Sequence, residues 1–447
     1  MAGIDLGSTG VKILVVRGAA EELLEEQVAT PWRAGPGGTT ELDAIALTTA
    51  VDSLLQSAAD RLAAMGVRTV DAISVAGMGE TGMLVDETLR APHPGFAWFD
   101  PRGQDEAEAF PRDLRDQFAG RTGLPLGAQV TVAKLAHLRR RGTPLGAYRW
   151  LDLPEFVVAS LGGDVALEYS LASRTGLLDQ DTDRPWPAML DLLGVEEGFM
   201  PELRDAGASW GTAREDLPGV FAGAALTVAG HDHLVAAEAG GSLDGDQYHV
   251  SIGTAEVLLR VSDVALGYEA RSRLAGHLIN EVRHVVPGKR VIVAGVKTGL
   301  LLRRALQAAG IHTRAGRDAL DRAVMALPLE GQLALDGIEV SGARNDDGVL
   351  RLTFRTDGIS PAEVFAAVLR HSNDEIQLLI DAIDRELPPA VSTTLTGGWA
   401  GMKSVQRARG QVLPGLSVTE REQETAYGAA LVGLRLLTSC HEAKTNH

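Results

Sequence analysis

The chain contains a single cysteine, Cys440, among 447 residues, so it cannot form an internal disulfide bond. A lone cysteine is typical of proteins in a reducing compartment, and without a second cysteine it predicts no redox or metal pair. No apolar run reaches the ~18–20 residues that a transmembrane helix needs. The first residues form an expected strand rather than the basic and apolar segments of a secretory signal. We therefore expect a cytoplasmic protein that is not bound to a membrane.

Basic residues are also scarce relative to acidic ones. The chain has 42 Lys and Arg against 59 Asp and Glu, which gives a formal net charge of −17. General nucleic-acid binding needs clustered Lys and Arg, so this balance argues against it. A nucleotide remains compatible, because a few local donors are enough to bind it. The length exceeds what one hydrophobic core supports and fits two domains of about 200–250 residues each.

A short glycine turn occurs twice in the chain. Residues 4–16 and 250–261 each read as a strand, a turn of small and hydroxyl residues, and a second strand, with Gly7 aligned to Gly253. Such a turn can direct several backbone N–H groups at one phosphate oxygen. One copy alone is more typical of an ordinary hairpin. Two copies suggest two related domains that face each other across a cleft, with a polyphosphate between them.

Asp232 is the strongest candidate for a catalytic residue. An apolar strand at 224–229 precedes it and a helix of small residues follows, so it is expected at the carboxyl end of a strand, where α/β sheets bind ligands. A carboxylate there can accept the proton of an attacking hydroxyl in phosphoryl transfer. The alternative is a structural role, because Asp is also a favoured residue for capping a helix.

Other polar residues stand close to these motifs. His231 and His233 would face the same way in an extended strand, but no third ligand stands near them in sequence, so we do not predict a zinc or iron site. Asp5, just before the first glycine turn, could hold Mg²⁺ directly or through water. Lys12 could contact a phosphate, or it could be a solvated strand residue.

The hydrophobic pattern predicts alternating strands and helices without a solenoid repeat. One long segment, 360–386, is expected to be interrupted after Arg370. The other expected helices span 43–65, 103–119, 130–142, 234–240, 298–309, 316–327 and about 421–438.

Seven short motifs, in this order, resemble the FGGY family of carbohydrate kinases, which includes xylulokinase, gluconokinase and glycerol kinase. The resemblance covers nearly the whole chain. It implies an α/β protein with the two-domain fold shared by actin, hexokinase and the Hsp70 ATPase, built from duplicated ribonuclease H-like domains at 1–243 and 244–438. The motifs are residues 3–12, 76–82, 98–102, 230–232, 251–254, 396–398 and 427–430.

The resemblance also implies roles for individual residues. Asp232 matches the catalytic base of the family, and Asp5 matches an aspartate associated with Mg²⁺. The implied phosphate and nucleotide contacts, with Lys12 added from its position, are Gly7, Ser8, Thr9, Lys12, Gly253, Thr254, Gly397 and Gly398. The implied substrate-binding residues are Glu80, Thr81, Trp98, Asp100, Arg102, Asp232 and His233.

Three departures from the family pattern bear on specificity. Where xylulokinases have Gln-Met-His, this chain has Met78-Gly79-Glu80; glycerol kinases have an arginine in place of Gly79. A sugar or polyol other than glycerol is therefore expected. Trp399 replaces a small residue beside the nucleotide turn, which puts the adenine contacts in question. The Gly-Glu-Arg-x-Pro stretch of the family is only faintly matched, at residues 341–345.

These observations favour an ATP- and Mg²⁺-dependent kinase for a small sugar or polyol, in which domain closure excludes water. A homodimer is possible. A related hydroxylated acid is an alternative substrate. A degenerate FGGY homologue or a nucleotide-dependent switch is an alternative from another class, since fold alone does not decide function. A switch would not need Asp232 together with Glu80, Asp100 and Arg102.

Overall fold

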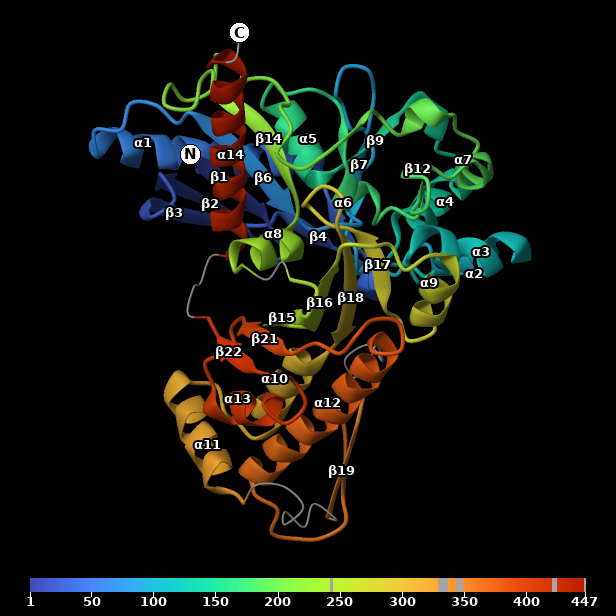
Figure 1. The fold of residues 1–447 in the computed structure, drawn as a ribbon, viewed down its shortest axis with the longest axis vertical. Helices are drawn as coiled ribbons and strands as arrows, with labels where there is room; N and C mark the ends of the chain where they lie inside the picture. The colour runs from blue at the N-terminus through green and yellow to red at the C-terminus, as the bar shows by residue number, and fades with distance from the viewer. Residues whose placement is uncertain (242–243, 329–336, 343–348, 420–423, 446–447) are drawn as a thin grey trace.

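The computed structural model describes residues 1–241, 244–328, 337–342, 349–419 and 424–445. Two large mixed sheets dominate it (Figure 1). The first sheet runs, in spatial order, through β14 (Ala225–His231), β6 (Ala72–Gly77), β1 (Ala2–Leu6), β2 (Gly10–Arg17) and β3 (Glu21–Ala29). The second runs through β17 (Asn280–Arg283), β18 (Arg290–Val296), β16 (Glu256–Ser262), β15 (Gln247–Ile252), β21 (Ser392–Thr396) and β22 (Leu416–Val418).

The two sheets repeat one topology. β1 pairs with β2 in an antiparallel hairpin and with β6 in parallel, and β15 pairs in the same way with β16 and β21. In each case the glycine turn joins the two strands of the hairpin. The α/β class and the duplicated arrangement predicted from the two turns are confirmed.

Helices cover the first sheet, whose central strands are buried on both faces. β1 and β6 are buried at every residue, as expected for strands between helical layers. α8 (Asp232–Ala239) and α14 (Glu424–Thr445) pack on this sheet, as do α1 (Ala44–Ala64) and α5 (Leu153–Ser160).

The C-terminal helix α14 crosses back from the second half to the first sheet (Figure 1). A Cβ atom on Gly3 would lie 1.9 Å from the carbonyl oxygen of Ala426, so only glycine allows this close approach. The predicted division at 243/244 assigns α14 to the second domain, whereas in space it completes the first. Residue 243, the last of the predicted first domain, lies outside the described residues, as do the side chain of Cys440 and residues 343–345 of the shortened motif.

The second sheet packs against helices to form its own hydrophobic core. These are α10 (Thr298–Ala308), α11 (Arg314–Ala326), α12 (Pro361–Ile383) and α13 (Lys403–Arg409), with the hairpin β19 (Ile338–Ser341) and β20 (Arg351–Phe354) beside α12. α12 is continuous, so the predicted interruption after Arg370 is wrong. Its N-terminus is fixed by a capping box between Ser360 and Glu363.

The rest of the first half consists of short elements between the strands of the first sheet. The predicted helix at 103–119 is instead two helices, because Pro111 ends one and begins the next. The strands are β4 (Trp32–Ala34), β5 (Thr40–Leu42), β7 (Gly82–Val85), β8 (Gly95–Phe96), β9 (Arg149–Asp152), β10 (Leu167–Glu168), β11 (Leu178–Asp179), β12 (Arg184–Pro185) and β13 (Leu203–Arg204). The helices are α2 (Gln104–Glu108), α3 (Arg112–Thr122), α4 (Thr131–Arg140), α6 (Tyr169–Ala172) and α7 (Pro187–Leu193), with short 3₁₀ turns at Pro36–Gly38, Leu145–Ala147 and Glu197–Phe199.

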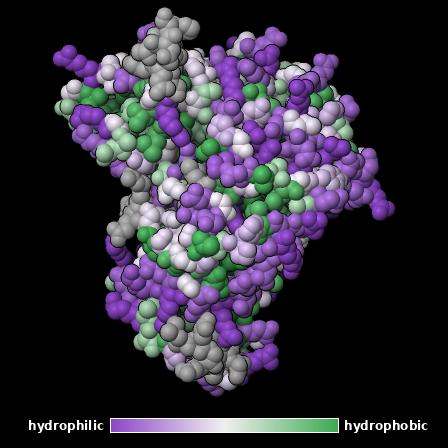
Figure 2. Space-filling model, in the orientation of Figure 1, coloured by the Kyte–Doolittle hydropathy of each residue, from purple (hydrophilic) through white to green (hydrophobic). Residues whose placement is uncertain are grey.

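The two halves also meet beside β17 and α9 (Tyr268–Ala275), which packs on α3. The fully buried Arg271 donates to Asp181 at 2.6 Å and to the carbonyl oxygen of Gly120 at 2.6 Å. Most of the visible surface is hydrophilic, with small hydrophobic patches (Figure 2). Within the described part of the chain, no helix combines the length and the apolar character needed to cross a membrane.

Candidate active site

The carboxyl ends of three parallel strands meet at one edge of the first sheet. Gly77 of β6 lies beside Leu6 of β1 on one side and beside His231 of β14 on the other. The residues that follow these strands therefore emerge together, and they include Gly7, Glu80 and Asp232. Ligands of α/β sheets bind at such an edge. The structure thus brings together residues that are more than 200 positions apart in sequence.

Asp232 is the first helical residue of α8, and His231 occupies the N-cap position. The alternative in which Asp232 itself caps the helix is therefore wrong. Its Oδ1 accepts a hydrogen bond of 2.6 Å from the backbone N–H of His233. Burial acts to raise the pKa of this carboxyl, but His233, His231 and the backbone N–H outweigh it, so the pKa lies below its ordinary value. Asp232 is consequently ionised at neutral pH, as a general base must be.

Asp5 differs from Asp232 although the two carboxyl groups interact. Burial, and next the negative charge of Asp232, raise the pKa of Asp5 to about 7, while Lys12 opposes them. The Nζ atom of Lys12 lies 4.0 Å from Oδ2 of Asp5, and Oδ1 is buried without a hydrogen-bond partner. A buried carboxylate oxygen without a donor is suited to a hard cation such as Mg²⁺, which often takes one or two carboxylates together with phosphate oxygens.

His231 and His233 lie beside Asp232 with ring centroids 5.7 Å apart. Burial lowers the pKa of His231 to about 3, so its ring is neutral at physiological pH. Among the residues that the structure describes, no group of three or more His, Cys, Asp or Glu side chains could hold a metal ion.

Two side chains that the sequence did not single out hold the first glycine turn. The hydroxyl of Thr30 donates to the carbonyl oxygen of Gly7 at 2.7 Å, and the indole N–H of Trp32 donates to that of Ser8 at 2.7 Å. Ser8 and Thr9 are exposed at the tip of the turn. Both carbonyl oxygens are thus held from the β3–β4 side, which fixes the orientation of the peptide groups in the turn.

The second glycine turn lies against the nucleotide motif. A Cβ on Gly397, whose φ is +93°, would lie 2.6 Å from the carbonyl oxygen of Ile252, so the chain needs glycine there. The carbonyl oxygen of Thr254 accepts from the backbone N–H of Leu300 at 2.8 Å, which ties the turn to α10. The turns at 253–254 and 397–398 thus follow two parallel strands at one edge, as in the first sheet.

Trp399 packs into the second half of the molecule. Its ring lies 6.5 Å from that of Phe365 of α12, and its indole nitrogen lies 3.0 Å from the position of a Cβ on Gly299. The large side chain thus fills the space between α10 and α12. This packing explains why a large side chain is present at position 399 without any contact with adenine.

Replacing Gly253 with valine is expected to abolish measurable ATP binding while the protein stays folded. A Cβ on Gly253 would meet no protein atom closer than 4.0 Å, so the side chain enters open space beside the turn. There a β-branched side chain would block the close approach of a phosphate to the backbone. Calorimetric titration with an ATP analogue measures the effect. Gly219→Val, at an equally open glycine away from the site, is the matched control, and unchanged ATP affinity in Gly253→Val would contradict the two-turn arrangement.

Asp100 and Arg102 form an ion pair that uses most of their hydrogen-bonding capacity. The carboxylate of Asp100 accepts from the backbone N–H of Thr40 at 2.6 Å and from Nη2 of Arg102 at 2.6 Å. Nη1 of Arg102 donates to Glu41 at 2.6 Å, and the guanidinium lies 3.6 Å from the ring centre of Phe96. Hydrogen bonds from Arg102 and Thr40 outweigh the effect of burial, so the pKa of Asp100 is lowered. The pair joins the segment at residues 100–102 to β5.

Glu80 pairs instead with Arg174, a residue that the sequence reasoning did not include. Nε of Arg174 donates to Oε1 of Glu80 at 2.6 Å, and the side chains are 12% and 8% exposed. Glu80 has a φ of +58°, a conformation that is strained for a residue with a side chain and is often found at functional sites. Ninety-four positions separate the two residues, and no local pattern signals the pair.

The other predicted substrate residues lie near Glu80 and Asp100 with different exposure. Thr81 is fully buried, and its hydroxyl oxygen has no hydrogen-bond partner. Trp98 is 39% exposed and packs edge-on against Phe99 at 5.3 Å between ring centroids. Lys134 donates to the carbonyl oxygen of Trp98 at 3.1 Å, and burial lowers its pKa to about 8. An exposed aromatic ring beside buried polar groups is suited to the apolar face of a sugar.

Three buried carboxyl groups lie beside β14, the strand that ends just before Asp232. Asp152, Glu155 and Glu168 are fully buried, and burial raises the pKa of each, that of Glu168 to about 7. Glu168 Oε2 accepts from the hydroxyl of Ser170 at 2.5 Å, and that hydroxyl accepts from the backbone N–H of His231 at 3.0 Å. The chain of hydrogen bonds fixes the backbone next to Asp232.

Glu168→Gln is expected to flatten the pH dependence of stability. Because the pKa of Glu168 is about 7 in the folded protein and ordinarily 4.5, the folded state binds more protons than the unfolded state between these values. Its contribution to stability therefore falls as pH rises through this window. The variant should gain on the order of 3 kcal/mol relative to the original chain between about pH 5 and pH 8, at about 1.4 kcal/mol per pKa unit. Urea denaturation measures this gain; Glu197→Gln on the surface is the control, and a constant difference across the window would contradict the assignment.

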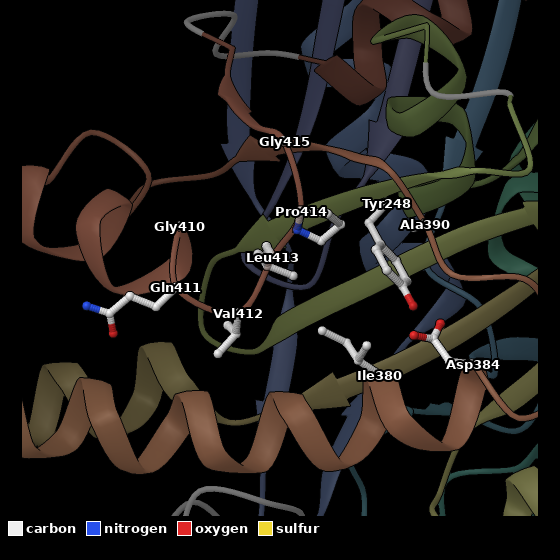
Figure 3. A pocket seen from close by; sticks show the side chains of 10 residues that line it. All are labelled: Tyr248, Ile380, Asp384, Ala390, Gly410, Gln411, Val412, Leu413, Pro414 and Gly415. Carbon is white, nitrogen blue, oxygen red and sulfur yellow. The ribbon is translucent and has the colours of Figure 1, made fainter. Parts of the chain in front are cut away.

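A surface pocket of about 390 Å³, whose lining residues Figure 3 shows, lies beside the start of β15. Tyr248, Ile380, Asp384, Ala390 and residues 410–415 line it. Tyr248 is near the start of β15, whereas the glycine turn follows its end, about 17 Å away at about 3.3 Å per residue. Burial raises the pKa of Tyr248 to about 12, so its hydroxyl is neutral. None of the predicted site residues lines this pocket, and it is not part of the candidate site.

Comparison with known proteins identifies the class to which this fold and site belong. Residues 1–238 match the N-terminal domain of the FGGY family of carbohydrate kinases, so the chain belongs to this family. A glycerol kinase from Thermus brockianus is 30% identical over 256 residues, which are 54% of this chain and 51% of the relative. The chain thus spans about half the length, or less, of the curated relatives that it matches.

Solved structures extend the likeness to the whole fold. A gluconate kinase from Lactobacillus acidophilus aligns with a TM-score of 0.85 and 15% identity over 98% of this chain and 89% of the other. A ligand-bound xylulose kinase from the same organism aligns with a TM-score of 0.84 and 15% identity over the same shares. The predicted two-domain actin-like fold is confirmed. Because one of these enzymes is named for a sugar acid and the other for a sugar, the fold does not identify the substrate of this chain.

Proposed function

We propose that this chain is an ATP-dependent kinase that transfers a phosphoryl group to a hydroxyl of a small sugar or polyol. The observation that carries the proposal is a pair of carboxyl groups at one sheet edge, that of the buried Asp5 and that of the partly buried Asp232. Asp232 is held ionised, whereas Asp5 has a raised pKa and an oxygen without a donor. One carboxylate suited to accept a proton beside another suited to a cation is what phosphoryl transfer to an alcohol requires.

In the proposed mechanism Asp232 accepts the proton of the substrate hydroxyl as the hydroxyl oxygen attacks the terminal phosphorus of ATP, and the bond from this phosphorus to the bridging oxygen breaks so that ADP leaves. The backbone N–H groups of the turns at 7–9 and 253–254 bind the phosphates, and Gly397 and Gly398 contact the nucleotide. Asp5 would hold Mg²⁺, which neutralises phosphate charge when bound. Lys12, 4.0 Å from Asp5, adds positive charge at the same edge. Closure of the two domains would exclude water and limit wasteful hydrolysis of ATP.

The substrate-binding residues in this proposal are Glu80, Thr81, Trp98 and His233. Asp100 and Arg102 hold the loop that carries Trp98, because their polar atoms are largely bound to each other and to neighbouring groups. This differs from the sequence-based set, in which both residues contact substrate directly.

An assay of ATP consumption with and without a panel of sugars, polyols and sugar acids tests the proposal. We expect turnover that depends on one class of acceptor, together with a rise in melting temperature when that acceptor is added. Slow ATP hydrolysis that no acceptor stimulates, or ATP binding without turnover, would instead favour the nucleotide-dependent switch or the degenerate homologue.

A further inference from the structure

The proposed mechanism does not use Arg174, whose guanidinium group has one nitrogen, Nη1, without a hydrogen-bond partner. Arg174 follows α6, and its Nε and Nη2 both contact the carboxylate of Glu80. Nη1, however, is buried and has no hydrogen-bond partner. Leaving a buried donor unpaired costs about 1–3 kcal/mol, more for a charged group, so such an atom marks a position where an acceptor is expected.

Arg174 packs against the backbone of Gly79, where a larger residue would not fit without a shift of its neighbours. A Cβ on Gly79 would lie 3.0 Å from Cδ2 of His231 and 3.1 Å from Cγ of Arg174. The backbone at Gly79 thus has the histidine next to Asp232 and the stem of Arg174 packed against it. The charge of Arg174 also reaches this group, because it contributes to lowering the pKa values of both His231 and Asp232. Arg174 therefore pairs with Glu80 and is near enough to the proposed base, Asp232, for its charge to act on it.

We propose that Arg174 is a substrate-binding residue that donates from Nη1 to a hydroxyl oxygen of the acceptor, while Glu80 accepts a hydroxyl proton. The inference rests on the proposed function and adds the substrate class, a neutral polyol or sugar rather than a sugar acid. A hydroxyl group both donates and accepts, so it matches a carboxylate and a guanidinium held side by side.

Charge excludes a carboxylate from this position. The charge of Arg174 is already neutralised by Glu80, and Asp232 adds a negative charge at the same edge. The nearby Lys134 is not free to donate a hydrogen bond to such a carboxylate, because its Nζ already donates to the carbonyl oxygens of Trp98, Ala128 and Gln129. A sugar acid would bring a further negative charge into a buried region, which is costly unless a cation forms a direct pair with it.

The experiment compares polyols with the aldonic acids of the same carbon skeleton, using both turnover and thermal-shift binding. The original chain should bind and phosphorylate the polyol. Arg174→Ala should raise its KM by more than about tenfold, the effect of losing one charged hydrogen bond. Guanidinium chloride at millimolar concentration should restore part of this loss, which a purely structural role would not predict. Arg184→Ala, at an exposed arginine, is the matched control.

Glu80→Gln provides the second arm, because it leaves the guanidinium without a counter-charge. In this variant kcat/KM for the acid, divided by kcat/KM for the polyol, should rise at least about tenfold. If there is no turnover, the same ratio is taken from the two binding affinities. The inference would be overturned by an unchanged KM in Arg174→Ala or by an unchanged ratio in Glu80→Gln. It would also be overturned if the original chain preferred the acids or did not bind polyols. Polyol binding without any turnover would contradict the proposed kinase activity and leave these binding ratios to decide the role of Arg174.

Discussion

Asp232→Asn is expected to lower kcat by at least about 100-fold, the lower range for loss of a general base. Asparagine has the same shape but cannot take the proton of the attacking hydroxyl. Its side-chain oxygen can still accept the 2.6 Å hydrogen bond from the backbone N–H of His233, so the start of α8 and the affinity for ATP should change little. Steady-state kinetics with the acceptor found in the panel, together with calorimetry for an ATP analogue, measure both quantities.

The control for this substitution is Asp191→Asn. Asp191 is exposed on α7 and has no predicted role in the site. The control should leave kcat within the error of the measurement. If Asp232→Asn folds, binds ATP and turns over within a fewfold of the original chain, Asp232 has no role as a base, and the mechanism proposed for this edge is wrong.

Arg409→Met is expected to lower the free energy of unfolding by about 3–5 kcal/mol, the usual cost of leaving a buried charge without its partner. Arg409 of α13 and Glu256 of β16 are both fully buried and share two hydrogen bonds of 2.7 Å. Nη2 also donates to the hydroxyl of Ser372 at 2.9 Å, and Nη1 donates to Asn373. Chemical denaturation measures the loss, which should also appear as a lower melting temperature.

Two further variants keep this prediction testable if Arg409→Met does not fold. The double variant Glu256→Leu with Arg409→Met removes both charges and should recover part of the stability, since a buried pair is often replaceable by apolar residues. Arg17→Met breaks the exposed pair with Glu21 and should cost less than about 1 kcal/mol. A loss in Arg409→Met no larger than that of Arg17→Met would show that the buried pair does not hold α13 to the second sheet.

The sequence predicts the backbone of the site well, because its signals are local. Gly7 and Gly253 each sit between two strands, and Asp232 stands where a strand ends. The edge of the first sheet that Gly7 and Asp232 share, and the matching edge of the second sheet at Gly253, therefore follow from topology alone. The structure keeps these residues at strand ends, with Asp232 beginning α8. Their chemical roles remain predictions, which the substitutions above address.

The pairing of charged side chains could not be predicted in the same way. Glu80 meets Arg174 and Glu256 meets Arg409 across 94 and 153 positions, and periodicity carries no information about such partners. The same cause explains the error in α12. The predicted break after Arg370 does not occur, and Ser372 and Asn373 are buried within α12, where they accept hydrogen bonds from the guanidinium of Arg409.

The return of α14 to the first sheet has a consequence for the order in which the protein can fold during synthesis. The first sheet is complete in sequence at His231, but the helix that covers β1 and β6 begins only at Glu424. At about 5–20 residues per second, the ribosome needs roughly 10–40 s to make the intervening chain. During that time the second half can fold while one face of the first sheet is still uncovered. The nascent chain therefore exposes apolar strand surface for tens of seconds, a period in which chaperones would protect it from aggregation.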